Sequence, residues 1–142
     1  MCAMNKVAQV LAALEALTLI AVGVMEAFFY RSPELYSIFL IEPGEYDAVR
    51  LWTVNVGFYN ILMGVGLIVA LVFVNTGRVA AGRTIVLYTS ALHVLLGIIL
   101  IISEPALWLS GAGEAGLALA VILAVLIGDR RSRADAAGPP PA

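Results

Sequence analysis

Four ionisable side chains lie inside stretches of the sequence that are otherwise strongly apolar. They are Glu15, Glu26, His93 and Glu114. An acid at the centre of a bilayer costs at least ~2.5–3.5 kcal/mol on insertion scales, so such a residue invites a functional hypothesis. A buried carboxylic acid could donate a proton to a ligand, and a histidine could relay protons. The alternative for each residue is a structural role, as a hydrogen-bonding contact between helices.

Glu15 and Glu26 should lie on one face of the first helix. They are 11 residues apart, and at ~100° per residue this spacing turns their directions by only about 20°. A row of small residues runs beside them: Ala12, Ala16, Gly23 and Ala27. Small residues let helices approach closely in lipid. We therefore expect both glutamates to point into the interior of the protein.

Two asparagines interrupt the apolar stretch TVNVGFYNILMG, residues 53–64. By helical geometry they point roughly 140° apart, so they cannot serve one narrow site directly. Asn55 shares a face with Tyr59, and we expect it at the depth of Glu26. The other side of the helix carries Gly57, Asn60 and Gly64. Asn60 is therefore predicted to be a close-packing contact nearer His93.

These positions predict a pocket near the outer surface. Its candidate residues are Glu26, Asn55, Tyr59 and Glu114, with secondary polar contacts from Glu15, Asn60 and His93. Glu114 would lie roughly 10 Å deep if its helix begins near residue 107. A later start would make it an N-terminal acid favoured by the helix dipole. One histidine and the single Cys2 are too few ligands for a usual metal site within one chain, and the sequence does not identify a cofactor.

The elements that must position these residues are apolar spans. The 142-residue chain is 62% hydrophobic and 13% charged, with a mean hydropathy of +1.00, whereas soluble domains are roughly 45–50% apolar and about 25% charged. About 20 apolar residues cross a ~30 Å bilayer core. This predicts one domain, 1–128, with helices at 7–30, 48–74, 84–102 and 107–128. The tail, 129–142, is polar and then Pro-rich, which predicts disorder.

The distribution of charge predicts the orientation. With four spans, the N-terminus, the second loop and the C-terminus share one side, which carries Lys6, Arg78, Arg83, Arg130, Arg131 and Arg133. The other side carries only Arg31 and Arg50. Cations favour the cytoplasmic side. We therefore predict an all-α integral membrane four-helix bundle with both termini cytoplasmic, in a bacterial plasma membrane. The net charge of -2 offers no basic footprint for nucleic acid.

The longest connection, residues 31–47, has the apolar centre LYSIFLI. This segment is apolar enough to lie on the membrane surface or to fold over the helices.

Part of the sequence resembles a known family. Residues 25–68, which begin MEAFFY and include NVGFYNILMGVGLI, resemble the small four-span membrane proteins catalogued as domain of unknown function thirteen-oh-four. That family typically has LEMFLW in helix one and NQGLYNGFLAAGLI in helix two. The matching positions here are Glu26, Phe28, Asn55, Gly57, Tyr59, Asn60 and Gly66. The resemblance implies a four-span fold. More distantly, the architecture is similar to DoxX-like four-helix proteins, by fold-level analogy only.

The chain departs from the family pattern at two positions. The family usually has a second glutamate eight residues before the one that matches Glu26, followed by a histidine. These positions are Thr18 and Leu19 here, while Glu15 lies one turn earlier. Any chemistry that requires the paired acid and histidine would therefore be altered in this chain.

Three classes of function remain open from the sequence, and the first is the one that the sequence favours. The first is a non-enzymatic accessory or oligomeric module, whose partners would be the lipid bilayer and a homo-oligomer or larger membrane complex. The second is a binding protein or enzyme for a hydrophobic small molecule, such as a quinone, an isoprenoid or a sterol-like compound. The third is an oligomeric transporter or channel. The chain does not carry the nucleotide-phosphate motif GxxxxGK[ST].

Overall fold

The computed structural model describes residues 4–137, and every regular element in that range is helical. The long helices are α1 (Lys6–Phe28), α3 (Tyr46–Asn75), α4 (Val79–Ser103) and α5 (Trp108–Ala137). The connection from α1 to α3 contains the 3-10 turn η1 (Pro33–Leu35), the short helix α2 (Tyr36–Phe39) and the turn η2 (Pro43–Glu45). A third turn, η3 (Pro105–Leu107), leads into α5. The all-α prediction is confirmed.

The long helices correspond to the four predicted spans. Within the described part of the chain, four segments are long enough and apolar enough to cross a membrane: Lys6–Phe28, Pro43–Asn75, Val79–Ser103 and Pro105–Ser132. Their mean hydropathy lies between 2.0 and 2.5. The fourth helix begins at Trp108, close to the predicted start at residue 107. Glu114 therefore lies beyond the first turn of α5.

Helix α5 extends beyond its predicted end at residue 128 and continues to Ala137. A disordered tail was predicted at 129–142. Its first part, DRRSRADAA, is instead helical because it is rich in Ala and Arg, which are strong helix formers. In addition, Arg83 of α4 forms a salt bridge with Asp129, which ties this part of α5 to its neighbour. Residues 138–142 of the predicted tail lie outside the described residues.

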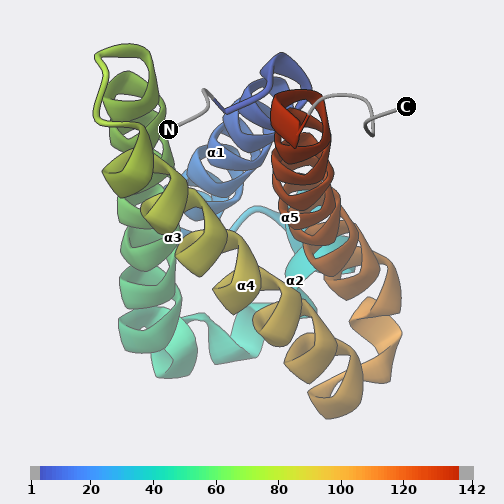
Figure 1. The fold of residues 1–142 in the computed structure, drawn as a ribbon. Coiled ribbons are helices and arrows are strands. Elements are labelled where there is room, and N and C mark those ends of the chain that lie inside the picture. The colour runs from blue at the N-terminus through green and yellow to red at the C-terminus, as the bar shows by residue number, and fades with distance from the viewer. Residues whose placement is uncertain (1–3, 138–142) are drawn as a thin grey trace.

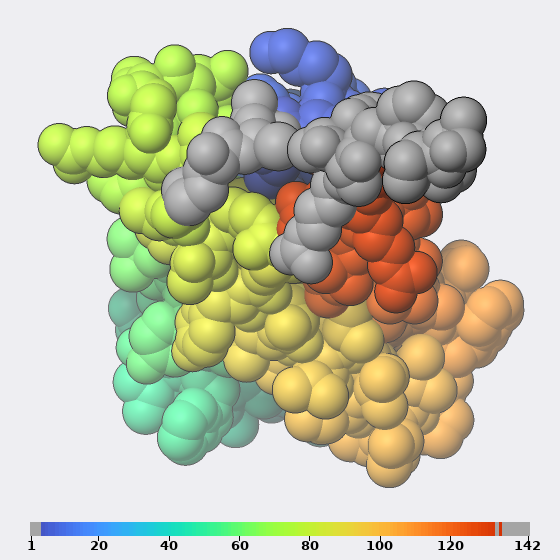
Figure 2. All heavy atoms as spheres, viewed as in Figure 1, coloured from blue at the N-terminus to red at the C-terminus, as the bar shows by residue number. Residues whose placement is uncertain are grey.

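The four long helices pack in a closed order. Helix α1 packs most extensively against α3, α3 and α5 both pack against α4, and the contact between α1 and α5 is the smallest of the four. In Figure 1, α4 crosses in front of the others between α3 and α5. The α3–α4 turn lies at the same end as the start of α1 and the end of α5, whereas α2 lies towards the opposite end. On the face shown in Figure 2, side chains of α4 fill the middle of the surface.

Small residues allow α1 and α3 to touch through their backbones. Ala12, Ala16, Gly23 and Ala27 are all buried, as predicted. A Cβ atom built on Gly57 would lie 2.6 Å from both the Ala27 nitrogen and the Gly23 carbonyl oxygen. A Cβ atom built on Gly64 would likewise lie 2.7 Å from the Ala16 carbonyl oxygen. The face of α3 that carries these two glycines is therefore the face that meets α1.

Candidate functional site

Both glutamates of α1 point towards neighbouring helices, as their spacing predicts. Glu15 is buried, with only 3% of its surface exposed, and Glu26 is half-buried. Each carboxylate is hydrogen-bonded to a side chain on another helix, Glu15 to α4 and Glu26 to α3. The two contacts form separate polar sites at different heights along α1.

The first site, the Glu15 cluster, consists of Glu15, Thr89, Ser90 and His93. Ser90 Oγ donates a hydrogen bond of 2.7 Å to Glu15 Oε2. His93 Nδ1 lies 2.8 Å from the Thr89 carbonyl oxygen and 3.7 Å from Glu15 Oε1. Because a carbonyl can only accept, the Nδ1 nitrogen must carry the proton in this contact. All four residues are buried, so the cluster connects α1 to α4 deep inside the protein.

Two atoms of the Glu15 cluster, Glu15 Oε1 and His93 Nε2, are buried without a hydrogen-bond partner. An unsatisfied buried polar group costs about 1–3 kcal/mol. None of the four residues lines either of the two cavities described below. The cluster therefore has the character of a polar contact between helices, which is the structural alternative for Glu15 and His93.

The second site joins Glu26 to Asn60. Asn60 Nδ2 donates a hydrogen bond of 2.7 Å to Glu26 Oε2. Asn60 follows Gly57 by one turn of α3 and precedes Gly64 by another, so it lies on the glycine face that meets α1. The close backbone approach at the glycines brings the short asparagine side chain within reach of the carboxylate.

The predicted partner of Glu26 was wrong. Asn55 is exposed, and its Nδ2 donates instead to the Leu51 carbonyl of its own helix, at 2.7 Å. Tyr59, on the same side as Asn55, is also exposed. The prediction that Asn60 lies near His93 was also wrong, because Asn60 bonds Glu26 while His93 lies beside Glu15. The 140° separation of the asparagines was correct, but the rotation of α3 about its axis was not.

The signal that would have identified the correct pair was present in the sequence. Gly57 and Gly64 share a side with Asn60, and small residues accompany Glu26 on the first helix. Two faces of small residues pack against one another because only they allow close approach in lipid. That rule would have turned Asn60, and not Asn55, towards Glu26.

A cavity of about 650 Å³ lies beside the Glu26–Asn60 pair, and we call it the α2 cavity. Its polar lining residues are Thr18, Glu26, Thr53, Asn60, Ser110 and Glu114. Its apolar lining residues are Leu19, Val22, Met25, Ile38, Phe39, Ile41, Val49, Trp52, Val56, Leu100 and Leu107. Of the predicted pocket residues, the structure brings Glu26 and Glu114 together on this cavity, whereas Asn55 and Tyr59 do not line it.

The connection between α1 and α3 contributes one wall of the α2 cavity. Ile38, Phe39 and Ile41 line it, so the apolar centre of this connection packs against the helices, one of the two predicted alternatives. Between them, Leu40 has a left-handed backbone conformation with φ 54°, which ends α2. This change of direction lets residues on both sides of Leu40 face the same cavity.

The chemistry available in the α2 cavity is hydrogen bonding in an apolar, partly open cavity. Glu26 and Glu114 can accept hydrogen bonds when ionised and donate one when protonated, and the Asn60 amide has both donors and an acceptor. Within residues 4–137, no group of three or more His, Cys, Asp or Glu side chains is arranged to hold a metal ion. The lining therefore suits an organic molecule with an apolar body and a polar group.

The comparison with protein families confirms the resemblance. The family described as Protein of unknown function (DUF1304) matches residues 13–128, which is most of the chain. No curated protein and no solved structure matches the chain. Thr18 and Leu19, where the sequence departs from the family pattern, both line the α2 cavity. With four helices apolar enough to span a membrane and a family match over this range, the chain belongs to the DUF1304 family.

Proposed function

We propose that this protein is an integral membrane four-helix bundle that binds a hydrophobic small molecule in the α2 cavity. The observation that carries the proposal is the Glu26–Asn60 hydrogen bond at the wall of an apolar cavity of about 650 Å³. Ligand sites typically enclose roughly 300–1,000 Å³, with an apolar lining and a few polar groups that fix orientation. The α2 cavity has both properties.

The polar groups indicate the class of ligand. Asn60 uses one amide hydrogen for Glu26, which leaves the second hydrogen and the amide oxygen for a ligand. Glu114 approaches the same cavity from α5. A molecule with a carbonyl or hydroxyl group on an apolar body would satisfy these groups and fill the remaining space. Quinones, isoprenoid alcohols and sterol-like compounds share this chemistry.

Decylubiquinone should bind to the α2 cavity and quench the fluorescence of Trp52, which lines it. In a Trp108→Phe background, Trp52 is the sole tryptophan. We expect saturable quenching, and we expect Asn60→Ala to raise the Kd about five- to tenfold, because one hydrogen bond contributes ~1 kcal/mol and 1.4 kcal/mol is tenfold. Fluorescence titration in mild detergent measures both.

Asn55→Ala is the matched control, since it removes the same amide from the same helix at an exposed position outside the lining. It should leave the Kd unchanged. Equal effects of the two substitutions, or quenching that rises linearly without saturation, would contradict binding in this cavity. If binding is saturable and depends on Asn60, mass spectrometry of an organic extract of the purified protein would identify the natural ligand.

We also propose that both termini lie on the cytoplasmic side of a bacterial plasma membrane. The start of α1, the end of α5 and the α3–α4 turn lie at the same end of the protein (Figure 1). Lys6, Arg78, Arg83, Arg130 and Arg131 belong to this end. The excess of cations there supports this orientation.

The orientation predicts how cysteines react in intact cells. Cys2 is the only cysteine, and a membrane-impermeant maleimide should modify it only after the membrane is permeabilised. In a Cys2→Ser background, Ser37→Cys, an exposed position in α2 at the opposite end, should react in intact cells. The reverse pattern would show that the protein is inserted in the opposite orientation.

A second candidate function is an accessory or oligomeric module. A Cβ atom added at Gly113 or Gly116 of α5 would meet nothing within 4 Å, and Ala112 beside them is also exposed. Such a face of small residues would let a helix of another protein approach closely. Gly116→Leu should then lower the oligomeric mass in mild detergent, as measured by light scattering. An unchanged mass would favour ligand binding as the sole function.

A further inference from the structure

A groove between the first turn of α1 and the last turns of α5 is distinct from the α2 cavity. It has a volume of about 590 Å³ and lies at the end of the protein where the two helices approach each other. One wall is formed by a row of apolar side chains on α5: Ala120, Leu123, Ala124 and Ile127. Arg131 continues this row by one further turn, so a cation lies at the end of an apolar face.

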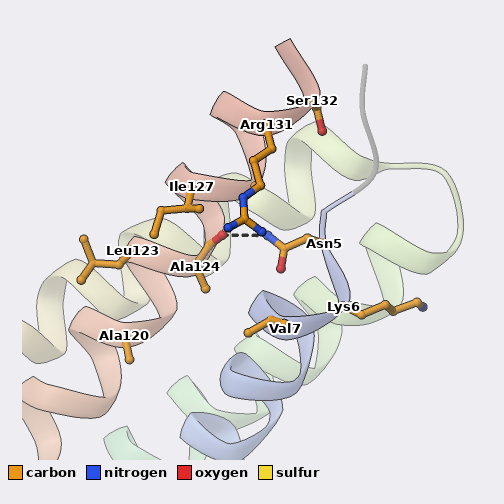
Figure 3. A pocket seen from close by; sticks show the side chains of 10 residues that line it. Asn5, Lys6, Val7, Ala120, Leu123, Ala124, Ile127, Arg131 and Ser132 are labelled. Atoms are coloured by element: carbon orange, nitrogen blue, oxygen red, sulfur yellow. Dashed lines mark hydrogen bonds between the residues drawn. The ribbon is translucent and has the colours of Figure 1, made fainter. Parts of the chain in front are cut away.

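Asn5 fixes the relative position of the two helices at this groove. Its Oδ1 accepts a hydrogen bond of 2.9 Å from the Ala8 N–H, which caps α1. Its Nδ2 donates a hydrogen bond of 2.7 Å to the Ala124 carbonyl of α5 (Figure 3). Asn5 also packs onto Gly128, where any Cβ atom would collide with the amide. These contacts fix how α1 and α5 approach each other beside the groove.

The charge at the groove is positive. In Figure 3 the Arg131 side chain descends from α5 towards Asn5, so the guanidinium lies at the groove, whereas the Lys6 side chain extends away from α5. Both residues belong to the lining, and none of the lining residues is acidic. The N-terminus of α1 adds the positive end of its helix dipole at the same place.

We propose that this groove binds one anionic phospholipid, with its phosphate on Arg131 and an acyl chain along the apolar row of α5. The proposal rests on the membrane insertion in the proposed function, but not on the α2 cavity. From Ala120 to Arg131 the row rises about 16 Å along the helix, which accommodates a headgroup and the adjoining part of a chain. Arginine binds phosphate through two parallel hydrogen bonds. Basic pockets between spans on the cytoplasmic side bind anionic headgroups.

The experiment is native mass spectrometry of the full chain in mild detergent, with phosphatidylglycerol and phosphatidylcholine of identical acyl chains. We expect one phosphatidylglycerol to bind severalfold more tightly than phosphatidylcholine. Arg131→Gln should weaken phosphatidylglycerol binding about fivefold, the factor expected for one cation near an anionic lipid, and remove the preference. Arg130 is an exposed neighbour outside the lining. Arg130→Gln should keep both the affinity for phosphatidylglycerol and the preference over phosphatidylcholine.

The apolar wall is tested separately. Ala120→Trp fills the groove and should weaken both lipids, while Leu119→Trp, an exposed position outside the lining, should weaken neither. The proposal would be overturned if the unmodified chain bound the two lipids with equal affinity. It would also be overturned if Arg131→Gln left the affinity for phosphatidylglycerol unchanged. Displacement of phosphatidylglycerol by an equal concentration of inorganic phosphate would overturn it too, because the site would then bind phosphate alone. Flotation of the reconstituted chain with liposomes checks membrane insertion independently.

Discussion

Gly57→Ala is expected to destabilise the protein by about 2–3 kcal/mol, because overpacking of a close contact costs roughly 1–3 kcal/mol. The added methyl would lie 2.6 Å from two backbone atoms of α1, the Ala27 nitrogen and the Gly23 carbonyl oxygen. Backbone atoms cannot move aside as the end of a flexible side chain can, so α1 and α3 must separate. This separation would also stretch the Asn60–Glu26 hydrogen bond, which lies one turn away.

The free energy of unfolding can be measured by titrating the detergent-solubilised protein with sodium dodecyl sulfate and following its tryptophan fluorescence. Gly66→Ala is the matched control, since Gly66 lies on α3 and an added Cβ would meet nothing within 4 Å. Because alanine is a better helix former than glycine by ~1 kcal/mol, this control should be neutral or slightly stabilising. If Gly57→Ala were as stable as Gly66→Ala, the close approach of α1 and α3 would be disproved.

Glu15→Ala is also expected to lower the free energy of unfolding, by about 2–3 kcal/mol. It removes the acceptor of the Ser90 hydroxyl and leaves that buried donor unsatisfied, at ~1–3 kcal/mol. It also leaves an unfilled space beside His93, which is 1% exposed. Glu15→Gln keeps a side-chain oxygen for Ser90 and nearly the same volume, so it should cost less than ~1 kcal/mol.

A double-mutant cycle tests whether this loss arises from the hydrogen bond to Ser90. Hydrogen bonds between membrane helices contribute ~0.6 kcal/mol on average and up to about 1.7 kcal/mol. Glu15→Ala combined with Ser90→Ala should therefore cost less than the sum of the two single changes by an amount in this range. Strictly additive losses would mean that Glu15 stabilises the protein through packing or through His93 instead.

The sequence predicted the components of the candidate site better than their pairing. The polarity of Glu26, Asn60 and Glu114 within apolar spans identified them as residues of interest, and Glu26 and Glu114 do line one cavity. Local periodicity also gave the angle between Asn55 and Asn60. Periodicity fixes directions only relative to other residues of the same helix, however, so it could not say which asparagine faces α1.

The sequence alone determined the four apolar helices and the interior face of α1, because both follow from local hydropathy and from a fixed turn of ~100° per residue. Only the tertiary structure decided that Glu15 bonds Ser90, that Glu26 bonds Asn60, and that residues on both sides of Leu40 line the α2 cavity. The rotation of each helix depends on where backbones can come close. Here the contacts of Gly57 and Gly64 with α1 fix the rotation of α3, and they involve residues far apart in the chain.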